Sequence, residues 1–453
     1  MSVDLPSPSC KALVVGGSGR VGGSVVRCLL RDGFDVCVTG RSEANYQSSL
    51  RRWRRLMGSS AASLLPRVQF QSLDLSDSDR LMRLLVQGNF DVVVNTAGPF
   101  QGKERAEVLE ALLKSDLSSL PVYLDVCDDI ELSMKVKARH EEAKQKGLTA
   151  IMSAGIWPGV SNLMGAQLKN LVETGGKGDS ILEGGREKEK EKDQLEELAF
   201  FFHTAGSGNS GASLISATFL ILAEQVLTYE RGEKKFYPPF SDPKTINFGA
   251  LIGEQEVFRM NLMEAHSCRE ALGVPSVSTR FGTAPPFWNQ LLRAMAFLPS
   301  SLLRNRDLME KLTLVSMPMI RLVDTFAGAK NGICVEARSK TGKRLVSRLE
   351  HKDLEACIGE AVAAFVAVSL QADPRLLSPG EGPAGGQGGK ALAEVSRTLT
   401  NLRLPSGVWY PEDPAAFGSG ARLKQVLEKI AQSAITSNTV SWDAETDRWV
   451  SIA

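Results

Sequence analysis

The sequence has little of several features that mark common protein classes. Its 7 cysteines form no C-x-x-C pair and their number is odd, which favours a reducing intracellular compartment over secretion. It has only 4 histidines, and no spacing of His, Cys and Asp resembles a metal site, so we expect no metal. The 53 basic and 52 acidic residues leave a net charge of +1, so we expect no nucleic acid partner.

No hydrophobic run is long enough to span a bilayer. The longest, Ala212–Ala223, is bounded by Glu224 and is typical of a buried helix. The segment Phe287–Val323 is rich in Leu, Met and Phe, but arginines and prolines interrupt it. We interpret it as a core or dimer-contact region rather than an interfacial membrane helix, which leaves a homodimer open. We expect no stable membrane insertion, and the amino terminus has no secretory signal pattern.

The sequence does contain a glycine-rich turn between an apolar run, Ala12–Val15, and a helix-like run, Ser24–Leu30. The turn is a G-x-G-x-x-G made of Gly17, Ser18, Gly19, Arg20, Val21 and Gly22. This order predicts the first strand, phosphate turn and helix of a dinucleotide-binding fold. We expect Gly17 to allow the tight turn, Gly19 to let a pyrophosphate approach, and Gly22 to let the helix pack closely.

An acid is missing where an NAD-binding fold usually has one. The second predicted strand, Phe34–Thr39, ends in Gly40, Arg41 and Ser42, with no carboxylate for a ribose 2′-hydroxyl. Arg41 instead stands where a 2′-phosphate would lie, because a guanidinium fork suits phosphate oxygens. Arg20 is a second candidate for the same phosphate. We therefore predict NADP as cofactor; the alternative is a solvated arginine on a surface turn.

Strand and helix patterns alternate from residue 11 to about 153. Further predicted strands are Val68–Ser72, Asp91–Asn95, Val122–Val126 and Thr149–Ser153. The pattern also predicts a helix start capped by Ser76 and one long helix over Asp129–Lys146. Alternation with short connections predicts an α/β fold, a Rossmann-type doubly wound parallel sheet over residues 1–153.

The rest of the chain changes character. Residues 154–420 mix strands and helices, which predicts an α+β substrate or dimerisation domain, and residues 421–453 form a C-terminal extension. Two segments of the 154–420 domain are interpreted as mobile insertions: 173–197, which is charged and low in complexity, and 374–390, which is rich in Gly and Pro. A hairpin is expected where 332–338 and 344–351 flank a Thr-Gly-Lys turn.

Ligand sites in such sheets gather at the carboxyl ends of the strands. The expected cofactor contacts there are Asp74, near the adenine, and Ala97, Gly98 and Pro99, near the nicotinamide ribose. The weak catalytic candidates are Asp125, Asp128 and His203. An N-cap is the stronger interpretation for Asp128 or Asp129, and a strand histidine satisfied within the fold is the stronger one for His203. Asn162 is a further candidate to bond the cofactor amide or the substrate.

Several stretches occur in the order of a known family: GGSGRVGGSVV, TGR, NTAGPF, YLDVCDD and SAGIWPGVSN, followed by HTAGSGNSG, GVPSVSTRFGTAPPFWN, DTFAG and PSGVWYPE. From Lys11 to about Glu412 the chain resembles the saccharopine dehydrogenase-like NADP-binding proteins, in particular a plant, algal and bacterial branch. The resemblance implies a Rossmann domain with an α+β domain. It also makes the cytoplasm or the plastid stroma the expected compartment.

The activity that the resemblance implies is NADP-dependent redox chemistry on a carbon–nitrogen or similar bond of a small-molecule substrate. Fold-level analogy does not transfer a substrate, so lysine-pathway activity is not implied. A second hypothesis stays open: a non-catalytic NADP(H)-binding sensor or interaction protein. The two differ in whether a closed, polar pocket faces the nicotinamide.

Overall fold

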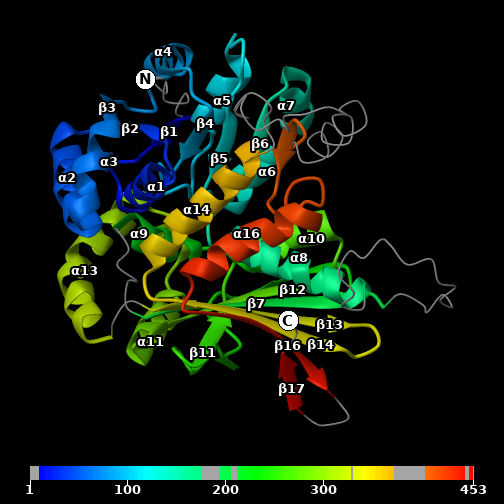
Figure 1. Ribbon diagram of the computed structural model, residues 1–453. Helices are drawn as coiled ribbons and strands as arrows, with labels where there is room; N and C mark the ends of the chain where they lie inside the picture. Colours follow the sequence, from blue (N-terminus) through cyan, green and yellow to red (C-terminus); the bar gives the residue numbers. More distant parts are fainter. Residues whose placement is uncertain are drawn as a thin grey trace, which may run out of the picture.

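The computed structural model describes residues 10–174, 193–205, 212–327, 330–371, 404–443 and 448–451. Two β-sheets organise them (Figure 1). Within these residues the first sheet has seven strands, all parallel, in the order β15-β6-β5-β4-β1-β2-β3. They are β1 Lys11–Val15, β2 Asp35–Gly40, β3 Val68–Ser72, β4 Val92–Asn95, β5 Val122–Asp125, β6 Thr149–Ile151 and β15 Gly407–Trp409. The predicted doubly wound parallel sheet is confirmed.

Helices cover both faces of this sheet. They are α1 Arg20–Arg31, α2 Glu43–Met57, α3 Ala61–Leu64, α4 Ser78–Gly88, α5 Glu107–Lys114, α6 Ile130–Lys137 and α7 His140–Lys146, with 3-10 turns Gly58–Ser60 and Leu65–Arg67 beside α3. Alternate residues of β1 serve the two faces: Val14 packs with Leu29 of α1, whereas Leu13 packs with Leu85 of α4. A strand covered on both sides must be apolar at every position, which is why β1 and β4 are continuous hydrophobic runs.

Two predicted helix boundaries are wrong in detail. The α4 helix is capped by Asp77, which accepts from the Arg80 N–H at 2.9 Å, and not by Ser76. The predicted helix over 129–146 is two helices, α6 and α7, which are separated at Ala138–Arg139. The break sets the His140 ring against β15, where its Nδ1 lies 2.9 Å from the Val408 carbonyl oxygen. At the other end of α6, Asp129 is the N-cap and accepts from Leu132 N at 2.6 Å, as predicted.

The second sheet is mixed and has ten strands among the described residues. Its main path is β10-β11-β12-β7-β13-β14-β16-β17; off this path, β8 pairs with β12, and β9 pairs with β8. Its strands are β7 Leu195–Ala205, β8 Val226–Glu230, β9 Glu233–Tyr237, β10 Lys244–Asn247, β11 Glu254–Arg259, β12 Ser276–Ala284, β13 Asn331–Ser339, β14 Arg344–His351, β16 Thr436–Asp443 and β17 Arg448–Ser451. The β13–β14 pair is antiparallel, so the predicted hairpin is confirmed.

A layer of helices joins the two sheets. The remaining helices are α8 Val160–Glu173, α9 Ala212–Ile221, α10 Met263–Leu272, α11 Pro286–Met295, α12 Ser300–Leu303, α13 Arg306–Ala327, α14 Leu354–Gln371 and α16 Gly420–Ser433. Figure 1 shows α8, α14 and α16 between the sheets. One hydrophobic cluster runs from Val14 of the first sheet through Ala361 and Val426 to Phe200 of the second. The two sheets therefore share a core.

The chain crosses between the sheets more often than a single boundary allows. After the second sheet, α14 packs along α1, and β15 then pairs with β6 in the first sheet. Residues 154–420 therefore do not form one domain by themselves, because the edge of β6 would be left with unpaired backbone groups without β15. The predicted extension after residue 420 is likewise part of the fold, since β16 pairs with β14. Of the two predicted insertions, 195–197 belong to β7, and most of 173–197 and all of 374–390 lie outside the described residues.

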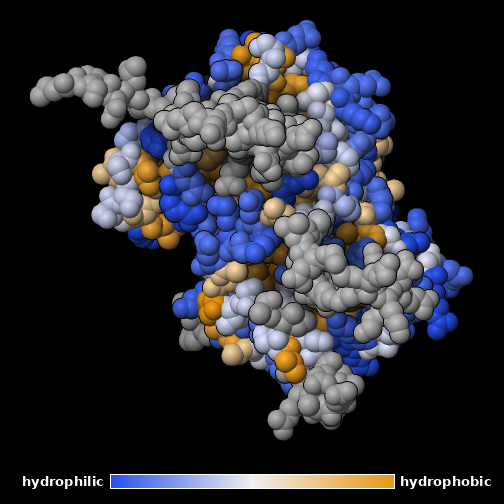
Figure 2. Space-filling view, turned by 45° about the vertical axis from the view of Figure 1, so that its right-hand side comes forward, coloured by the Kyte–Doolittle hydropathy of each residue, from blue (hydrophilic) through white to orange (hydrophobic). Residues whose placement is uncertain are grey.

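The two apolar segments differ in burial. The Ala212–Ala223 run forms α9, and Phe219–Ile221 are buried there, as predicted. The Phe287–Val323 segment forms α11, α12 and α13, but many of its large side chains are exposed, so the prediction of a core region is wrong for them. Among the described residues, no helix has both the length and the apolar character needed to cross a membrane. The face in Figure 2 is mainly hydrophilic, with its hydrophobic residues in small groups.

Candidate functional site

The glycine-rich turn joins β1 to α1 with very little space around it. Gly16 has φ +75°, and a Cβ on it would lie 2.9 Å from the Ala97 Cα. The residue of the turn with a positive φ is thus Gly16, which lies directly before the predicted motif. A Cβ on Gly17 would instead lie 2.9 Å from the Val14 carbonyl oxygen, so this glycine permits packing under the turn.

The start of α1 is open to an anion. Gly19 is the N-cap residue and has no side chain to accept from the helix, and the first turn carries no acid. A Cβ on Gly19 would meet only the Gly16 carbonyl oxygen, at 3.1 Å, whereas one on Gly22 would lie 2.5 Å from both Gly16 O and Thr96 Oγ1. Gly22 therefore lets α1 approach the turn, and Gly19 leaves its outer side clear. Uncapped N–H groups at a helix start attract phosphate through their partial positive charge.

The end of β2 touches the same turn. A Cβ on Gly40 would lie 2.1 Å from Ser18 Oγ, so only glycine lets this strand end come so close. Arg41 follows directly and is exposed. Hydrogen bonds from Ser76 lower the pKa of Asp74, and the positive charge of Arg41 lowers it further. Ser42 caps α2 by accepting from Asn45 N at 3.3 Å. The structure thus places Arg41 next to both the turn and Asp74; their contact with a nucleotide stays a prediction.

The guanidinium of Arg20 is paired with a carboxylate from the second half of the chain. Its Nη1 lies 3.4 Å from Glu355 Oε2 at the start of α14, and Arg52 Nη2 lies 3.7 Å from the other oxygen of the same carboxylate. Arg52 also donates to the Gly19 carbonyl oxygen at 3.3 Å. Glu355 and Arg52 are missing from the predicted site, because no local pattern links residue 355 to the turn.

The loop after β4 is held by donors from two directions. Lys103 Nζ donates to the Ala97 carbonyl oxygen at 3.0 Å, and Arg306 of α13 donates to the Pro99 and Gln101 carbonyl oxygens at 3.1 and 3.4 Å. Gly98 is exposed, and Ala97 and Pro99 are half-buried. The outer side of this loop is therefore open, and the predicted contact of its backbone with a nicotinamide ribose stays a prediction.

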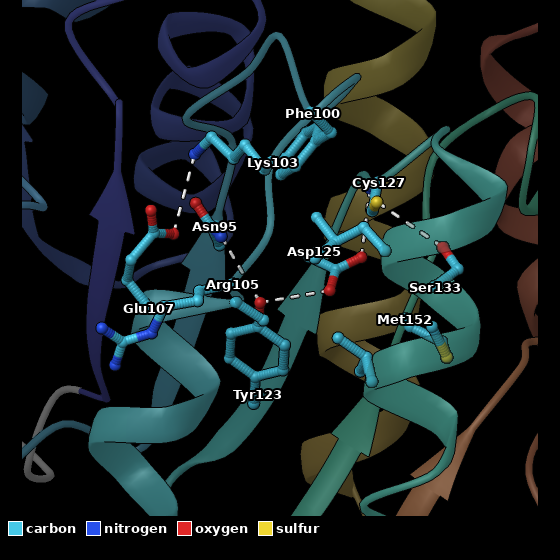
Figure 3. A pocket seen from close by; sticks show the side chains of 13 residues that line it. Asn95, Phe100, Lys103, Arg105, Glu107, Tyr123, Asp125, Cys127, Ser133 and Met152 are labelled. Carbon is cyan, nitrogen blue, oxygen red and sulfur yellow. Dashed lines mark hydrogen bonds and ion pairs between the residues drawn. The ribbon is translucent and has the colours of Figure 1, made fainter.

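Asp125 is buried at the end of β5 and bonded on all sides. Its Oδ1 accepts from Ser153 N at 2.7 Å and from Cys127 N at 3.1 Å, and its Oδ2 accepts from the Tyr123 hydroxyl at 3.1 Å. Tyr123 in turn accepts from Asn95 Nδ2 at 3.4 Å, so a polar chain joins β4, β5 and β6 (Figure 3). Burial raises the pKa of Asp125. This carboxylate holds three strand ends together and is only 3% exposed, so it is not presented to a substrate.

Two cavities were located near the first sheet. The one behind Asp125 in Figure 3 offers ≈ 10 Å³, about enough for one water. The other, ≈ 660 Å³, lies beside α4 and β3 and extends to Lys11 and Asp35 at the amino ends of β1 and β2. Ligands of such sheets bind at the carboxyl ends of the strands. The small cavity lies there, beside Asn95 and Asp125, but it is too small for a substrate, and the larger cavity reaches the opposite strand ends.

Asp128 is the catalytic candidate that stays accessible. It is half-buried after β5, and burial raises its pKa to about 6. The N-cap of α6 is Asp129, so the Asp128 carboxylate is not used to cap this helix. A carboxyl with a pKa near neutrality beside the β4 loop has the properties of a general acid or base. The neighbouring Cys127 is not a nucleophile candidate, because burial raises its thiol pKa well above the usual value.

Asn162 lies in a closed polar network at the start of α8. Its Oδ1 accepts from Gly159 N at 2.8 Å, and its Nδ2 donates to Ser267 Oγ and to Glu412 Oε1, both at 2.8 Å. It is 1% exposed, so the expectation that it bonds a cofactor or substrate is wrong. Glu264 belongs to the same network through Ser161, and burial raises its pKa to about 7.

His203 lies on the far side of the second sheet from the segment that follows β6. Trp157 of that segment stacks on Phe202, with ring centroids 5.0 Å apart. His203 is the next residue along β7 and therefore faces the other way, where its ring lies 5.6 Å from that of Phe248. It is 2% exposed, and burial lowers its pKa to about 4. The interpretation as a strand histidine within the fold fits this position.

Within the part of the chain that the structure describes, no group of three or more His, Cys, Asp or Glu side chains could hold a metal ion. Sequence reasoning missed Arg306, which donates to two carbonyl oxygens of the loop after β4, and Glu264, which accepts from Ser161 in the buried network at the start of α8. Their positions come from tertiary contacts between distant segments, and a single sequence carries no local signal for them.

Comparisons with known proteins agree with this fold. Residues 12–151 match the family model of the saccharopine dehydrogenase NADP binding domain. The apo saccharopine dehydrogenase (L-Glu forming) of Saccharomyces cerevisiae has the same overall fold: the TM-score is 0.55 at 14% identity, over 95% of this chain and 100% of that chain. Identity at this level shows a shared fold and nothing about substrate.

Shorter matches come from curated proteins. A bifunctional UDP-glucose 4-epimerase and UDP-xylose 4-epimerase from Pisum sativum is 33% identical over 90 residues, which is 20% of this chain and 25% of that protein. A UDP-glucose 4-epimerase from Cyamopsis tetragonoloba is 34% identical over 86 residues, or 19% and 23%. The chain thus spans about a quarter of the length of these relatives. The segment that matches the model of the saccharopine dehydrogenase NADP binding domain, residues 12–151, contains the glycine-rich turn and Arg41.

Proposed function

We propose that this protein is an NADP-dependent oxidoreductase that transfers a hydride to or from a carbon–nitrogen or carbonyl-type bond of a small metabolite. The observation that carries the proposal is the start of α1: an uncapped helix end, an open face at Gly19, and a guanidinium directly after β2 at the position where NAD-binding folds have an acid. These features fit a pyrophosphate and a 2′-phosphate better than a 2′-hydroxyl.

NADP(H) supplies or accepts the hydride when bound. The residues of this chain then have three tasks. The α1 terminus and Arg41 bind the phosphates; the loop Ala97–Pro99, fixed by Lys103 and Arg306, sets the backbone near the reacting ring; and Asp128 gives or takes the proton that accompanies reduction or oxidation. The expected compartment remains the reducing cytoplasm or plastid stroma.

A second function has support of its own. The polar groups of Asp125 and Asn162 are bonded within the protein, and the cavity behind Asp125 holds only about one water. These observations favour a non-catalytic NADP(H)-binding sensor, which needs the phosphate site but no substrate pocket.

The two functions separate in one set of measurements. NADPH and NADH are first titrated into the full chain, and a panel of small carbonyl and imine compounds is then followed by nicotinamide absorbance. For the oxidoreductase we expect turnover with NADPH, and Asp128→Asn should remove turnover while NADPH binding stays within twofold. Binding without turnover, unchanged in Asp128→Asn, would support the sensor. No binding of either nucleotide would end both proposals.

A further inference from the structure

The larger of the two cavities, ≈ 660 Å³, is a groove on the face of the first sheet that carries α4. Its floor includes Gln69 and Gln71 of β3, and its wall includes residues of α4: Arg80, Arg83, Leu84 and Gln87. Figure 1 shows α4 and β3 near the same edge of the first sheet. We call this cavity the α4 groove. Its volume lies within the range of small-molecule sites, about 300–1,000 Å³.

The groove exists because α4 leaves part of this face uncovered. The Phe70 ring stacks on an aromatic ring of α2, with centroids 4.4 Å apart, so its neighbours Gln69 and Gln71 point to the opposite face of β3. On that face, Leu85 of α4 is buried in a cluster with Leu13 of β1. The helix therefore lies over the middle of the sheet, and the edge strand β3 presents two exposed glutamines beside it.

The side of α4 that borders the groove is basic. Arg80, Arg83, Leu84 and Gln87 are spaced three, one and three residues apart, which places them on one side of the helix. Both arginines are exposed. Since residues three apart are neighbours on a helix surface, the two guanidinium groups can contact one anion from the same side.

Positive charge exceeds negative charge in the lining of the groove. The charged residues that line it are Lys11, Arg67, Arg80, Arg83 and Asp35. Arg67 is paired with Asp35, because its Nε lies 2.8 Å from the Asp35 Oδ1. Among the described residues, Lys11, Arg80 and Arg83 form no ion pair. Three cations of the lining are therefore left without a carboxylate in contact.

The acids near the groove do not change this result. Asp77 caps α4, and Asp91 accepts from the Lys11 backbone N–H at 2.8 Å. Asp79 is exposed one turn before Arg83, and no ion pair joins the two side chains. None of these three acids lines the groove. An anion that enters it meets guanidinium groups rather than carboxylates.

We propose that the α4 groove is a binding site for a small organic phosphate. The phosphate lies between Arg80 and Arg83, since guanidinium groups present paired N–H donors that match phosphate oxygens. Gln69 and Gln71 bond the hydroxyl groups of the organic part, because a side-chain amide both donates and accepts. The glutamines thereby favour a hydroxyl-bearing phosphate over inorganic phosphate.

This site is separate from the proposed nucleotide site. The nucleotide is expected where β1 and β2 end, at Gly19 and Arg41, whereas the groove extends to Lys11 and Asp35 at the beginnings of the same strands. The groove also includes Leu73, directly before the predicted adenine contact, so the experiment includes NADPH. The proposal does not rest on the proposed function, since it needs no cofactor to be bound.

Isothermal titration of the full chain at low ionic strength tests the proposal. The ligands are ribose 5-phosphate, glucose 6-phosphate and 3-phosphoglycerate, with inorganic phosphate and ribose as comparisons. At least one organic phosphate should bind saturably and more tightly than inorganic phosphate, and ribose should not bind. Saturating NADPH should change the dissociation constant of that organic phosphate by less than about twofold.

Two double variants separate the parts of the site. Arg80→Gln with Arg83→Gln should raise the dissociation constants of the organic phosphate and of inorganic phosphate about tenfold or more. Gln69→Ala with Gln71→Ala should weaken the organic phosphate alone. All four side chains are exposed, so the melting temperature should stay at the wild-type value and show that both variants fold.

The matched control is Arg54→Gln with Arg55→Gln, two exposed arginines of α2, which should leave every affinity unchanged. Absence of saturable binding for all three organic phosphates would overturn the proposal, as would an equal loss in this control. Binding that NADPH displaces and Arg41→Ala weakens would assign the phosphate to the nucleotide site instead. An organic phosphate that binds no more tightly than inorganic phosphate, or that the glutamine variant leaves unchanged, would also refute the proposed site.

Discussion

Replacing Arg41 with alanine should change the cofactor preference of this protein. The structure leaves Arg41 as the guanidinium next to the end of β2, since Arg20 and Arg52 both lie near the Glu355 carboxylate. Gly40, directly before it, is so close to Ser18 of the phosphate turn that a Cβ would lie 2.1 Å from its hydroxyl oxygen. A 2′-phosphate at this place therefore falls within reach of the Arg41 side chain.

A charge-assisted hydrogen bond contributes roughly 1.5–3 kcal/mol. Arg41 is exposed, so solvent screening reduces its contribution to the lower part of this range. Arg41→Ala should therefore raise the NADPH dissociation constant about 10- to 30-fold, at roughly 1.4 kcal/mol per factor of ten. NADH has no 2′-phosphate, and its dissociation constant should change less than about twofold.

Isothermal titration of both nucleotides at two salt concentrations measures the effect. Arg55→Ala is the matched control, because Arg55 is an exposed arginine on the helix that follows Arg41. It should leave both affinities unchanged. An equal loss for NADPH and NADH in Arg41→Ala, or an Arg55→Ala effect as large as that of Arg41→Ala, would refute a specific contact with the 2′-phosphate.

Further substitutions separate fold from function. Gly22→Ala should lower the free energy of unfolding by about 1–3 kcal/mol, because its Cβ would lie 2.5 Å from two oxygens. Gly19→Ala should keep the melting temperature but weaken NADPH binding in titration. Asp125→Ala strips three buried donors of their acceptor, so chemical denaturation should show a loss of roughly 3–6 kcal/mol, and Asp125→Asn a smaller one. For His203 the folded pKa of about 4 lies below the unfolded value, so stability is complete above about pH 6.5 and is lost as pH falls toward 4. Relative to His203→Gln, the wild type should lose about 3 kcal/mol between pH 7 and 4 in denaturant titrations; parallel curves would contradict this.

The nucleotide end of the molecule could be predicted from sequence because each of its signals is local. The apolar run Ala12–Val15, the glycine turn and the exchange of an acid for Arg41 lie within about thirty residues. Strands and helices have fixed residue periods, so such short patterns predict where each side chain lies. The error at Gly16 is of the same kind: the motif identifies the turn, but which glycine takes a positive φ depends on how closely Ala97 approaches.

The catalytic end could not be predicted in the same way. Asp125 and Asn162 stand in suitable places, yet their bonds come from Ser153, Glu412 and other residues that the fold brings in from elsewhere. The sequence pattern of a carboxylate at a strand end is the same whether the carboxylate contacts a substrate or accepts from three donors of the protein. Only the partners decide between these roles, and they are set by tertiary structure.

The phosphate turn itself depends on a segment far along the chain. Gly359 of α14 lies against α1, and a Cβ on it would fall 2.3 Å from Ser24 Oγ, so the two helices pack as closely as backbones allow. The same helix brings Glu355 to Arg20 beside the turn. Since α14 follows the β13–β14 hairpin and packs on α1, and β15 pairs with the edge of β6, the nucleotide-binding half is completed by segments that lie beyond the hairpin in the chain. The first 153 residues specify where a nucleotide binds, but both halves of the chain are needed to hold that place in shape.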